Sequence, residues 1–296
     1  MSHNANTQII DPAAGSYDTN NLVFFEPASG SIPGGGPAIS FQRINIGTKN
    51  PDGTVGDLIL QTSRLFSFGV SENTDPSSGN VNGWTMPLCL WNRDGPTDTE
   101  KAWTDTFNEI VEKCIDHVLD HKEEIDKYEL ERSDLKKFNP LYWKKEKKMV
   151  NGKPQLVVVE GSGPTLYSKL IYSKKNEKFV TRFYDENDEL IAPLDLIGKY
   201  CYTTAAVKIE SIFIGNKISL QVKLYEADVE PQQSGMKRLI SRPKAVAKVA
   251  EVQSGSSAAD VMGGDDDSGD ESDGSIEAAP VQKKVVKKVV KRVVKK

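Results

Sequence analysis

Short apolar runs separated by glycine and proline fill residues 22–91, and their alternation predicts β-strands. In the segment ISFQRINI the apolar positions alternate with polar ones with a single slip, as in strands that are buried on one face only. A further strand is predicted over Trp84–Trp91, and strand signals return after Pro164 in TLYSKLIY and KFVTRFY. The pattern therefore predicts a mainly β protein.

Residues 207–224 carry the strongest β signal. One arm alternates Val207, Ile209, Ser211 and Phe213 with Lys208, Glu210, Ile212 and Ile214. Gly215-Asn216 follows and predicts a two-residue hairpin turn. The return arm places Ile218, Leu220, Val222 and Leu224 on one face and Lys217, Ser219, Gln221 and Lys223 on the other. We expect the folded part to end near Pro231.

One long α-helix is predicted near residues 98–134. Six residues fall on one stripe at helical spacing: Trp103, Phe107, Ile110, Cys114, Val118 and Ile125. Thr97 or Asp98 can cap the start of this helix, and its opposite face is acidic.

Composition divides the chain into three parts. A hydrophobic content of 38% is low for 296 residues, so part of the chain is expected to be unfolded. We expect a disordered arm over residues 1–20, a folded domain over 21–231 and a disordered tail over 232–296. The tail has an acidic tract at 265–273, which either occupies a cationic groove until nucleic acid displaces it or serves as a solubilising spacer. Its basic end, 283–296, is expected to bind phosphates, with an acidic partner or a nuclear import signal as alternatives. A membrane is not an expected partner, because valine is a poor helix former and only a helix would suit an anionic membrane surface.

The cysteines, histidines and possible nucleophiles of this sequence do not form a known enzyme motif. Three distant cysteines and the lack of a signal-peptide pattern or a membrane-length apolar run predict an intracellular protein. Cys114, His117, His121 and Glu124 have the spacing of metal ligands on a helix, but the apolar stripe that includes Cys114 favours a plain helix. No nucleophile with an adjacent base is evident. We therefore predict a binding protein without metal or cofactor rather than an enzyme.

Aromatic and basic residues are interleaved from Lys136 to Tyr184. This stretch has twelve Lys or Arg against three Glu, among eight aromatic residues. Single-stranded nucleic acid needs cations for its phosphates and exposed rings for its unpaired bases. The alternative is that half of the rings face a β-sheet core while the lysines are solvated. Within TLYSKLIY the alternation exposes Tyr167 beside Lys169 and places Tyr172 on the face of Leu166 and Leu170.

The segments FNPLYWKK, GPTLYSKLIY and SLQVKLYEA, with the helix between the earlier strands and these segments, resemble the OB-fold single-stranded DNA-binding proteins of nucleocytoplasmic large DNA viruses. Those proteins are similar to the replication protein of short-tailed phages. The resemblance implies an OB-fold-like barrel, sequence-independent binding of single-stranded DNA, a possible homodimer, and contact with a polymerase or helicase through the tail. The resemblance also implies a location in the cell or particle: the viral factory in the host cytoplasm, the nucleus or the virion.

The resemblance and the charge pattern together select ten groove residues: Tyr142, Trp143, Lys144, Lys145, Tyr167, Lys169, Tyr172, Lys174, Lys175 and Arg182. In the resembling family the acidic tail is C-terminal, whereas here a lysine-valine repeat follows the acidic tract. A structural or packaging protein of a virion, in which only the basic tail contacts DNA, is the alternative function.

Overall fold

The computed structural model describes residues 4–15, 17–32, 39–76, 78–150 and 153–232. The chain separates into two compact units, Met1–Leu239 and Ile240–Lys296. The second unit and the predicted disordered tail from residue 233 onward, with its acidic and basic tracts, lie outside the described residues.

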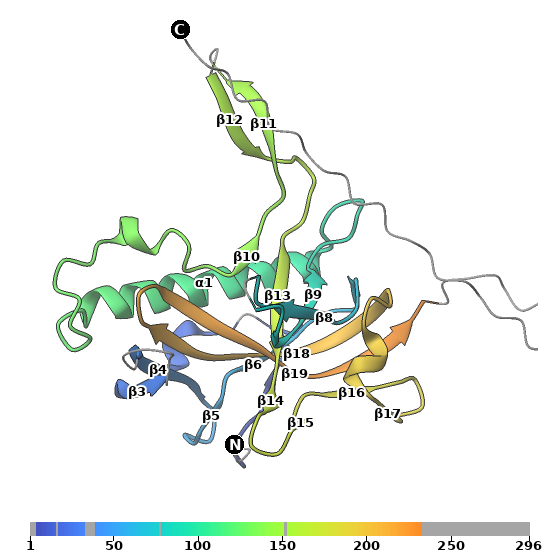
Figure 1. Cartoon of the computed structure of the whole chain (residues 1–296), viewed down its shortest axis with the longest axis horizontal. Coiled ribbons are helices and arrows are strands. Elements are labelled where there is room, and N and C mark those ends of the chain that lie inside the picture. The colour runs from blue at the N-terminus through green and yellow to red at the C-terminus, as the bar shows by residue number, and fades with distance from the viewer. Residues whose placement is uncertain (1–3, 16, 33–38, 77, 151–152, 233–296) are drawn as a thin grey trace, which may run out of the picture. The chain divides into compact units, whose positions relative to one another are not determined.

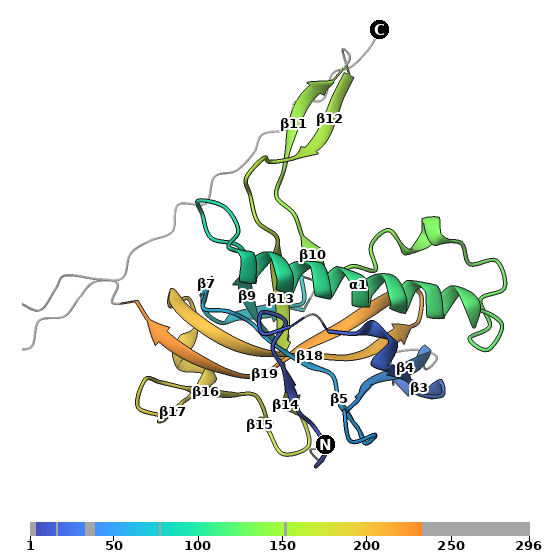
Figure 2. The ribbon, with the colours of Figure 1, turned by 180° about the vertical axis from the view of Figure 1, so that it is seen from behind.

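Five strands of the first unit form a closed barrel by their pairing. Figure 2, the ribbon of Figure 1 seen from behind, labels all five. In ring order they are β7 (Leu65–Ser67), β9 (Val81–Cys89), β13 (Thr165–Leu170), β19 (Ile218–Pro231) and β18 (Cys201–Ile214), and β18 pairs with β7 to close the ring. All neighbours are antiparallel except β13 and β19. Because the fourth strand returns to lie beside the first, the barrel is a Greek key, as in the OB-fold. The predicted OB-fold-like barrel is confirmed.

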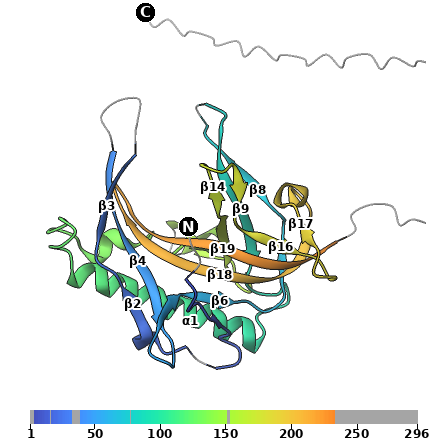
Figure 3. The ribbon, with the colours of Figure 1, turned by 90° about the horizontal axis from the view of Figure 1, so that it is seen from below.

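Six strands from the N-terminal part of the chain extend the barrel beside β18 (Figure 3). β18 pairs with β4 and β6; β4 also pairs with β2, β3 and β5; β1 pairs with β6. Their bounds are β1 (Ile9–Ile10), β2 (Leu22–Phe24), β3 (Ala28–Ile32), β4 (Ile39–Lys49), β5 (Val55–Asp57) and β6 (Ile59–Gln61). The expectation of a disordered arm over residues 1–20 is therefore wrong for β1, whose backbone pairs with Ile59 and Leu60.

The remaining strands are short. β8 pairs with β9, β10 with β13, β16 with β19 and with β17, while β11 pairs with β12 and β14 with β15 in two small separate sheets. Their bounds are β8 (Ser71–Thr74), β10 (Leu141–Tyr142), β11 (Lys145–Val150), β12 (Lys153–Val158), β14 (Tyr172–Ser173), β15 (Lys178–Phe179), β16 (Arg182–Tyr184) and β17 (Leu190–Ile191). The described residues also form three 3₁₀ turns: η1 (Thr19–Asn21), η2 (Arg132–Leu135) and η3 (Pro193–Leu196).

The helix α1 (Asp98–Asp120) contributes its apolar stripe to the same core as the barrel. Thr97, one of the two predicted caps, accepts a hydrogen bond from the Glu100 N–H, and the Glu100 carboxylate accepts one from the Thr97 N–H, which forms a capping box. The predicted stripe is buried, including Ile125, but the helix ends at Asp120 rather than near residue 134. Beyond it the chain turns through Asp126, whose φ is 55°. On β18 and β19, Lys208, Gln221 and Lys223 are partly buried and alternate with buried apolar residues, so they lie on the face away from the core.

Candidate nucleic-acid interface

Lys169, Lys223 and Lys208 lie side by side on three neighbouring barrel strands. The backbone pairing puts Lys169 of β13 opposite Lys223 of β19, and Lys223 opposite Lys208 of β18. Because neighbouring strands are about 4.8 Å apart, three like charges are confined to a row about 10 Å long, and such an arrangement destabilises a sheet. We call these three residues the lysine row. Neighbouring acidic or polar groups must offset this repulsion in the free protein, and an anionic ligand could do so when bound.

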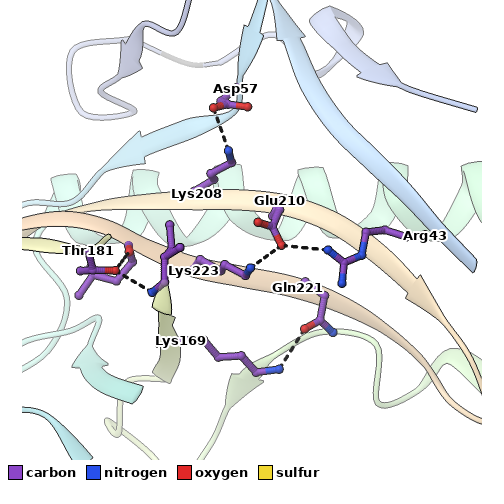
Figure 4. Close-up of polar contacts among 10 residues, drawn as sticks. Arg43, Asp57, Lys169, Thr181, Lys208, Glu210, Gln221 and Lys223 are labelled. Carbon is purple, nitrogen blue, oxygen red and sulfur yellow. Dashed lines mark hydrogen bonds and ion pairs between the residues drawn. The ribbon is translucent and has the colours of Figure 1, made fainter. Parts of the chain in front are cut away.

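Each amino group of the row is held by an oxygen atom (Figure 4). The Nζ atom of Lys223 lies 2.8 Å from a carboxylate oxygen of Glu210, and that of Lys208 lies 2.8 Å from Asp57. Lys169 donates a hydrogen bond of 2.9 Å to the neutral side chain of Gln221. Desolvation, reinforced by the charge of Lys223, lowers the pKa of Lys169 below its ordinary value. The row is therefore fixed in position before any ligand binds.

A β-bulge at Glu210 aligns the row. The loop between β18 and β19 has three residues, because Ile214 pairs with Ile218; the predicted two-residue turn is wrong. The longer loop moves the register by one residue, and the bulge between Ile209 and Ser211 moves it back. Only after this second shift does Lys208 face Lys223. The bulge also aims the Glu210 carboxylate at Lys223 and, at 3.7 Å, at Arg43 of β4.

Two tyrosine rings continue the row at the β13 end. The side chains of Tyr142 and Tyr167 are 57% and 50% exposed, and their ring centroids are 6.2 Å apart in an edge-to-face arrangement. Tyr167 and Lys169 alternate with the buried Leu166, Ser168 and Leu170, which confirms that they are exposed side by side on one strand. Exposed rings beside a cation are the combination that stacking on unpaired bases requires.

A pocket of about 450 Å³ borders the lysine row and is lined by Lys169, Lys223, Arg43, Trp84 and Lys174, among others. Among the described residues, the Nε1 atom of Trp84 and the Nε atom of Arg43 are buried without a hydrogen-bond partner. Leaving a buried donor unsatisfied costs about 1–3 kcal/mol. An acceptor oxygen of a ligand or of solvent that reached these donors would remove that cost.

One wall of this pocket is an aromatic cluster. The ring of Trp84 lies 4.9 Å from that of Tyr172 and 4.8 Å from that of Phe179, between centroids. Thr181 ties the β14–β15 hairpin to the barrel, because its Oγ1 accepts a hydrogen bond of 2.8 Å from the Ile171 N–H and donates one of 2.6 Å to the Leu224 carbonyl. Tyr172, which alternation places on the core face, instead follows the end of β13 and is half-buried at this wall.

The structure brings five of the ten selected residues together around the lysine row: Tyr142, Tyr167, Lys169, Tyr172 and Lys174. Lys144, Lys145 and Lys175 are exposed, the first two where the chain enters β11 and the third in the β14–β15 turn. Trp143 is half-buried and packs edge-on against Trp91 at 5.2 Å, so it stabilises the fold instead of offering a free ring. Arg182 is exposed on β16 and is not among the residues that line the pocket.

Lys208, Lys223, Arg43 and Trp84 belong to the site but are not among the residues selected from the sequence. The alternation of the return arm does place Lys223 and Gln221 on the outer face. The pairing of Lys223 with lysines on both sides, however, depends on the bulge and on the parallel β13–β19 contact. Only an accurate register for all three strands would have revealed the row.

Two of the four possible metal ligands, Cys114 and His117, lie on α1 and pack against other side chains, whereas His121 and Glu124 follow the end of the helix. Cys114 is fully buried in the core, and burial raises its pKa to about 12. The ring of His117 stacks on Phe24 with centroids 3.9 Å apart. The described part of the chain contains no group of three or more His, Cys, Asp or Glu side chains arranged to hold a metal ion. Within the same residues, no helix is both long and apolar enough to cross a bilayer.

Residues 15–272 match the model of a family described as "Protein of unknown function (DUF2738)". The chain belongs to the DUF2738 family. Over 246 residues it is 28% identical to "Uncharacterized protein 007R" of Invertebrate iridescent virus 3, a match that covers 77% of this chain and 51% of the relative. The chain thus spans about half the length of that relative.

A second relative, "Early 31 kDa protein" of Frog virus 3, is 28% identical over 219 residues, which cover 73% of this chain and 78% of the relative. Both relatives are viral proteins, which supports the predicted viral origin of this DUF2738 member.

Proposed function

We propose that this protein binds single-stranded DNA without regard to sequence, during viral DNA replication, recombination or repair. The observation that carries the proposal is the lysine row next to the exposed rings of Tyr142 and Tyr167. The row contacts phosphates, and the rings stack on unpaired bases. Each stacked base contributes about 1–3 kcal/mol and every base has a flat face, so binding of this kind tolerates any sequence.

One end of the lysine row, Lys169 on β13, lies where OB-folds bind oligonucleotides, whereas Lys223 and Lys208 lie on β19 and β18. In OB-folds, oligonucleotides bind across the second and third barrel strands and the adjoining loops. Those strands are β9 and β13 here, and β13 carries Tyr167 and Lys169. The fold alone does not determine function, but Lys169 and the exposed Tyr167 of this chain lie on one of the strands that OB-folds use.

The alternative function is a structural or packaging protein whose DNA contacts are confined to the basic repeat at 283–296, which has eight basic residues and no acid. In that case the barrel would make protein contacts. The repeat would then bind duplex and single strands alike, because phosphate contacts do not read base pairing.

Deleting residues 245–296 separates the two functions. Full-length and shortened proteins are titrated against fluorescent oligo-dT and a matched duplex over a salt series. We expect the shortened protein to keep tight, salt-dependent binding to oligo-dT and to bind the duplex weakly. Loss of oligo-dT binding by a shortened protein with an unchanged far-UV spectrum would favour the packaging function.

A further inference from the structure

The ribbon formed by β11 and β12 is separate from the barrel sheet (Figure 1). Six residue pairs join its strands, from Lys145 opposite Val158 to Val150 opposite Lys153. A hydrogen bond of 2.9 Å from the Val159 N–H to the Lys144 carbonyl closes its base. Two-stranded ribbons are at best marginally stable in water. Because the ribbon adds little stability by itself, we expect it to have a function that does not depend on packing in the barrel core.

One face of the ribbon combines lysines with exposed apolar side chains. Because paired residues share a face, Lys145, Lys147 and Met149 lie on the same side as Val158, Leu156 and Pro154. The side chains of Met149, Leu156 and Val158 are 70%, 65% and 40% exposed. This face has two lysines and no acidic residue, and we call it the apolar-lysine face.

The opposite face is less suited to an anion. It carries Glu146, and the Nζ atom of Lys148 lies 2.8 Å from the Glu146 carboxylate. Lys153 is its second lysine. The two faces thus have equal numbers of lysines, but only on this opposite face is a lysine engaged by an acid.

We propose that the apolar-lysine face binds duplex DNA that adjoins a single strand held on the lysine row, an inference that rests on the proposed function. A DNA groove has anionic walls and a floor of base edges that includes apolar thymine methyl groups, so it matches both kinds of side chain. A two-stranded ribbon fits a major groove, and proteins that bind the minor groove combine lysines with Met, Leu or Pro side chains placed against base steps. The charge of this face selects DNA over an apolar protein surface.

The attachment of the ribbon fixes where such a duplex lies. Lys145 begins β11 three positions after Tyr142, whose ring contacts Tyr167 at the end of the lysine row. Trp143, packed on Trp91, anchors the segment between them. A strand stacked on Tyr142 therefore has its base-paired continuation next to the ribbon, and the protein recognises junctions between single and double strands.

Full-length protein is titrated against three probes: oligo-dT, the same oligo-dT joined to a hairpin duplex, and the hairpin alone. Wild type is compared with Lys145→Ala/Lys147→Ala and with Met149→Ser/Leu156→Ser. The matched control is Lys148→Ala/Lys153→Ala, which removes the same charge from the opposite face. All variants keep the basic repeat at 283–296, so its contribution cancels.

We expect wild type to bind the junction several-fold tighter than oligo-dT. Both variants of the apolar-lysine face should lose this preference while their affinity for oligo-dT stays unchanged. The lysine variant should lower the salt slope on the junction probe by about 2, as expected for two phosphates. The control should keep most of the preference.

Equal binding of junction and oligo-dT by wild type would overturn the inference, as would a preference that survives in both variants. A change of oligomeric state in the variants, measured by sedimentation, would instead assign this face to contacts between copies of the chain. Failure of wild type to bind oligo-dT would contradict the proposed function itself, and this result is separate from the comparison of ribbon faces.

Discussion

The carboxylate of Glu210 lies 2.8 Å from the Nζ atom of Lys223, inside the surface that we assign to DNA. Glu210 is only 8% exposed and is also 3.7 Å from Arg43, so one buried acid holds two of the cations of the site. The same carboxylate repels an approaching phosphate. Glu210 therefore orders the cations in the free protein and opposes the ligand that they would bind.

Replacing Glu210 by Gln should tighten binding to oligo-dT several-fold and steepen its salt dependence. The amide keeps the size of the side chain but frees Lys223 and Arg43 for phosphates, which adds up to about 1–2 units to the salt slope. Fluorescence anisotropy over a salt series measures both quantities. Glu109→Gln, on the exposed face of α1, is the control. Weaker binding by Glu210→Gln would mean that the carboxylate serves only to position the cations.

Replacing Tyr167 by Ala should weaken oligo-dT binding by about 1–3 kcal/mol, the value of one stacked base. Because the ring is half exposed and faces away from the core, the thermal unfolding temperature should change little. Tyr128→Ala removes a ring that is 63% exposed and distant in sequence from the lysine row, and it should leave affinity unchanged. Equal affinities for the Tyr167 variant and wild type would exclude the ring as a stacking platform.

The features that the sequence predicted well depend on local periodicity. The stripe from Trp103 to Val118 repeats at helical spacing, and alternation in β13 placed Tyr167 and Lys169 outward. The helix was predicted too long because Ile125 continues the stripe and is buried, although the chain has already left the helix. The spacing of apolar residues indicates which positions are buried. It does not show whether a buried residue such as Ile125 lies in a helix or in a turn.

The features that escaped prediction depend on contacts between distant segments. Lys169 and Lys223 become neighbours only through the parallel β13–β19 pair, and Arg43 reaches Glu210 only because β4 lies beside β18. The role of Trp143 was also misjudged, since its ring packs on Trp91. Charge and ring density selected a region of the chain without distinguishing rings that pack in the core from rings that are exposed.

Removing single lysines of the row should lower the salt slope for oligo-dT by about 0.7 per residue, the value for one phosphate on a single strand. Lys169→Ala is the cleanest case, because Lys169 bonds a neutral amide and its loss leaves no acid unpaired. Lys208→Ala would expose the charge of Asp57 and should weaken binding further. Lys113→Ala, on the exposed side of α1, supplies the control. An unchanged slope for Lys169→Ala would remove it from the phosphate contacts.

The pKa of His117 predicts how stability depends on pH. Burial, with a smaller effect from neighbouring His121, lowers this pKa to about 4 from an ordinary value of 6.5. Between these two values the unfolded chain binds a proton that the folded protein does not, so the free energy of unfolding falls as pH decreases from 6.5 to 4. Because His117 is half-exposed, solvent screening reduces this loss to about 1–2 kcal/mol.

Urea denaturation of wild type and His117→Gln at pH 7, 5.5 and 4.5 measures this loss. The glutamine keeps a polar side chain next to Phe24 but cannot titrate, so the variant should lose less stability than wild type over this range. The carboxylates contribute equally to both proteins, and the difference between the two curves therefore isolates His117. Parallel curves would show that the imidazole is protonated as readily in the folded protein as in the unfolded chain, and that its stack on Phe24 does not exclude the charged form.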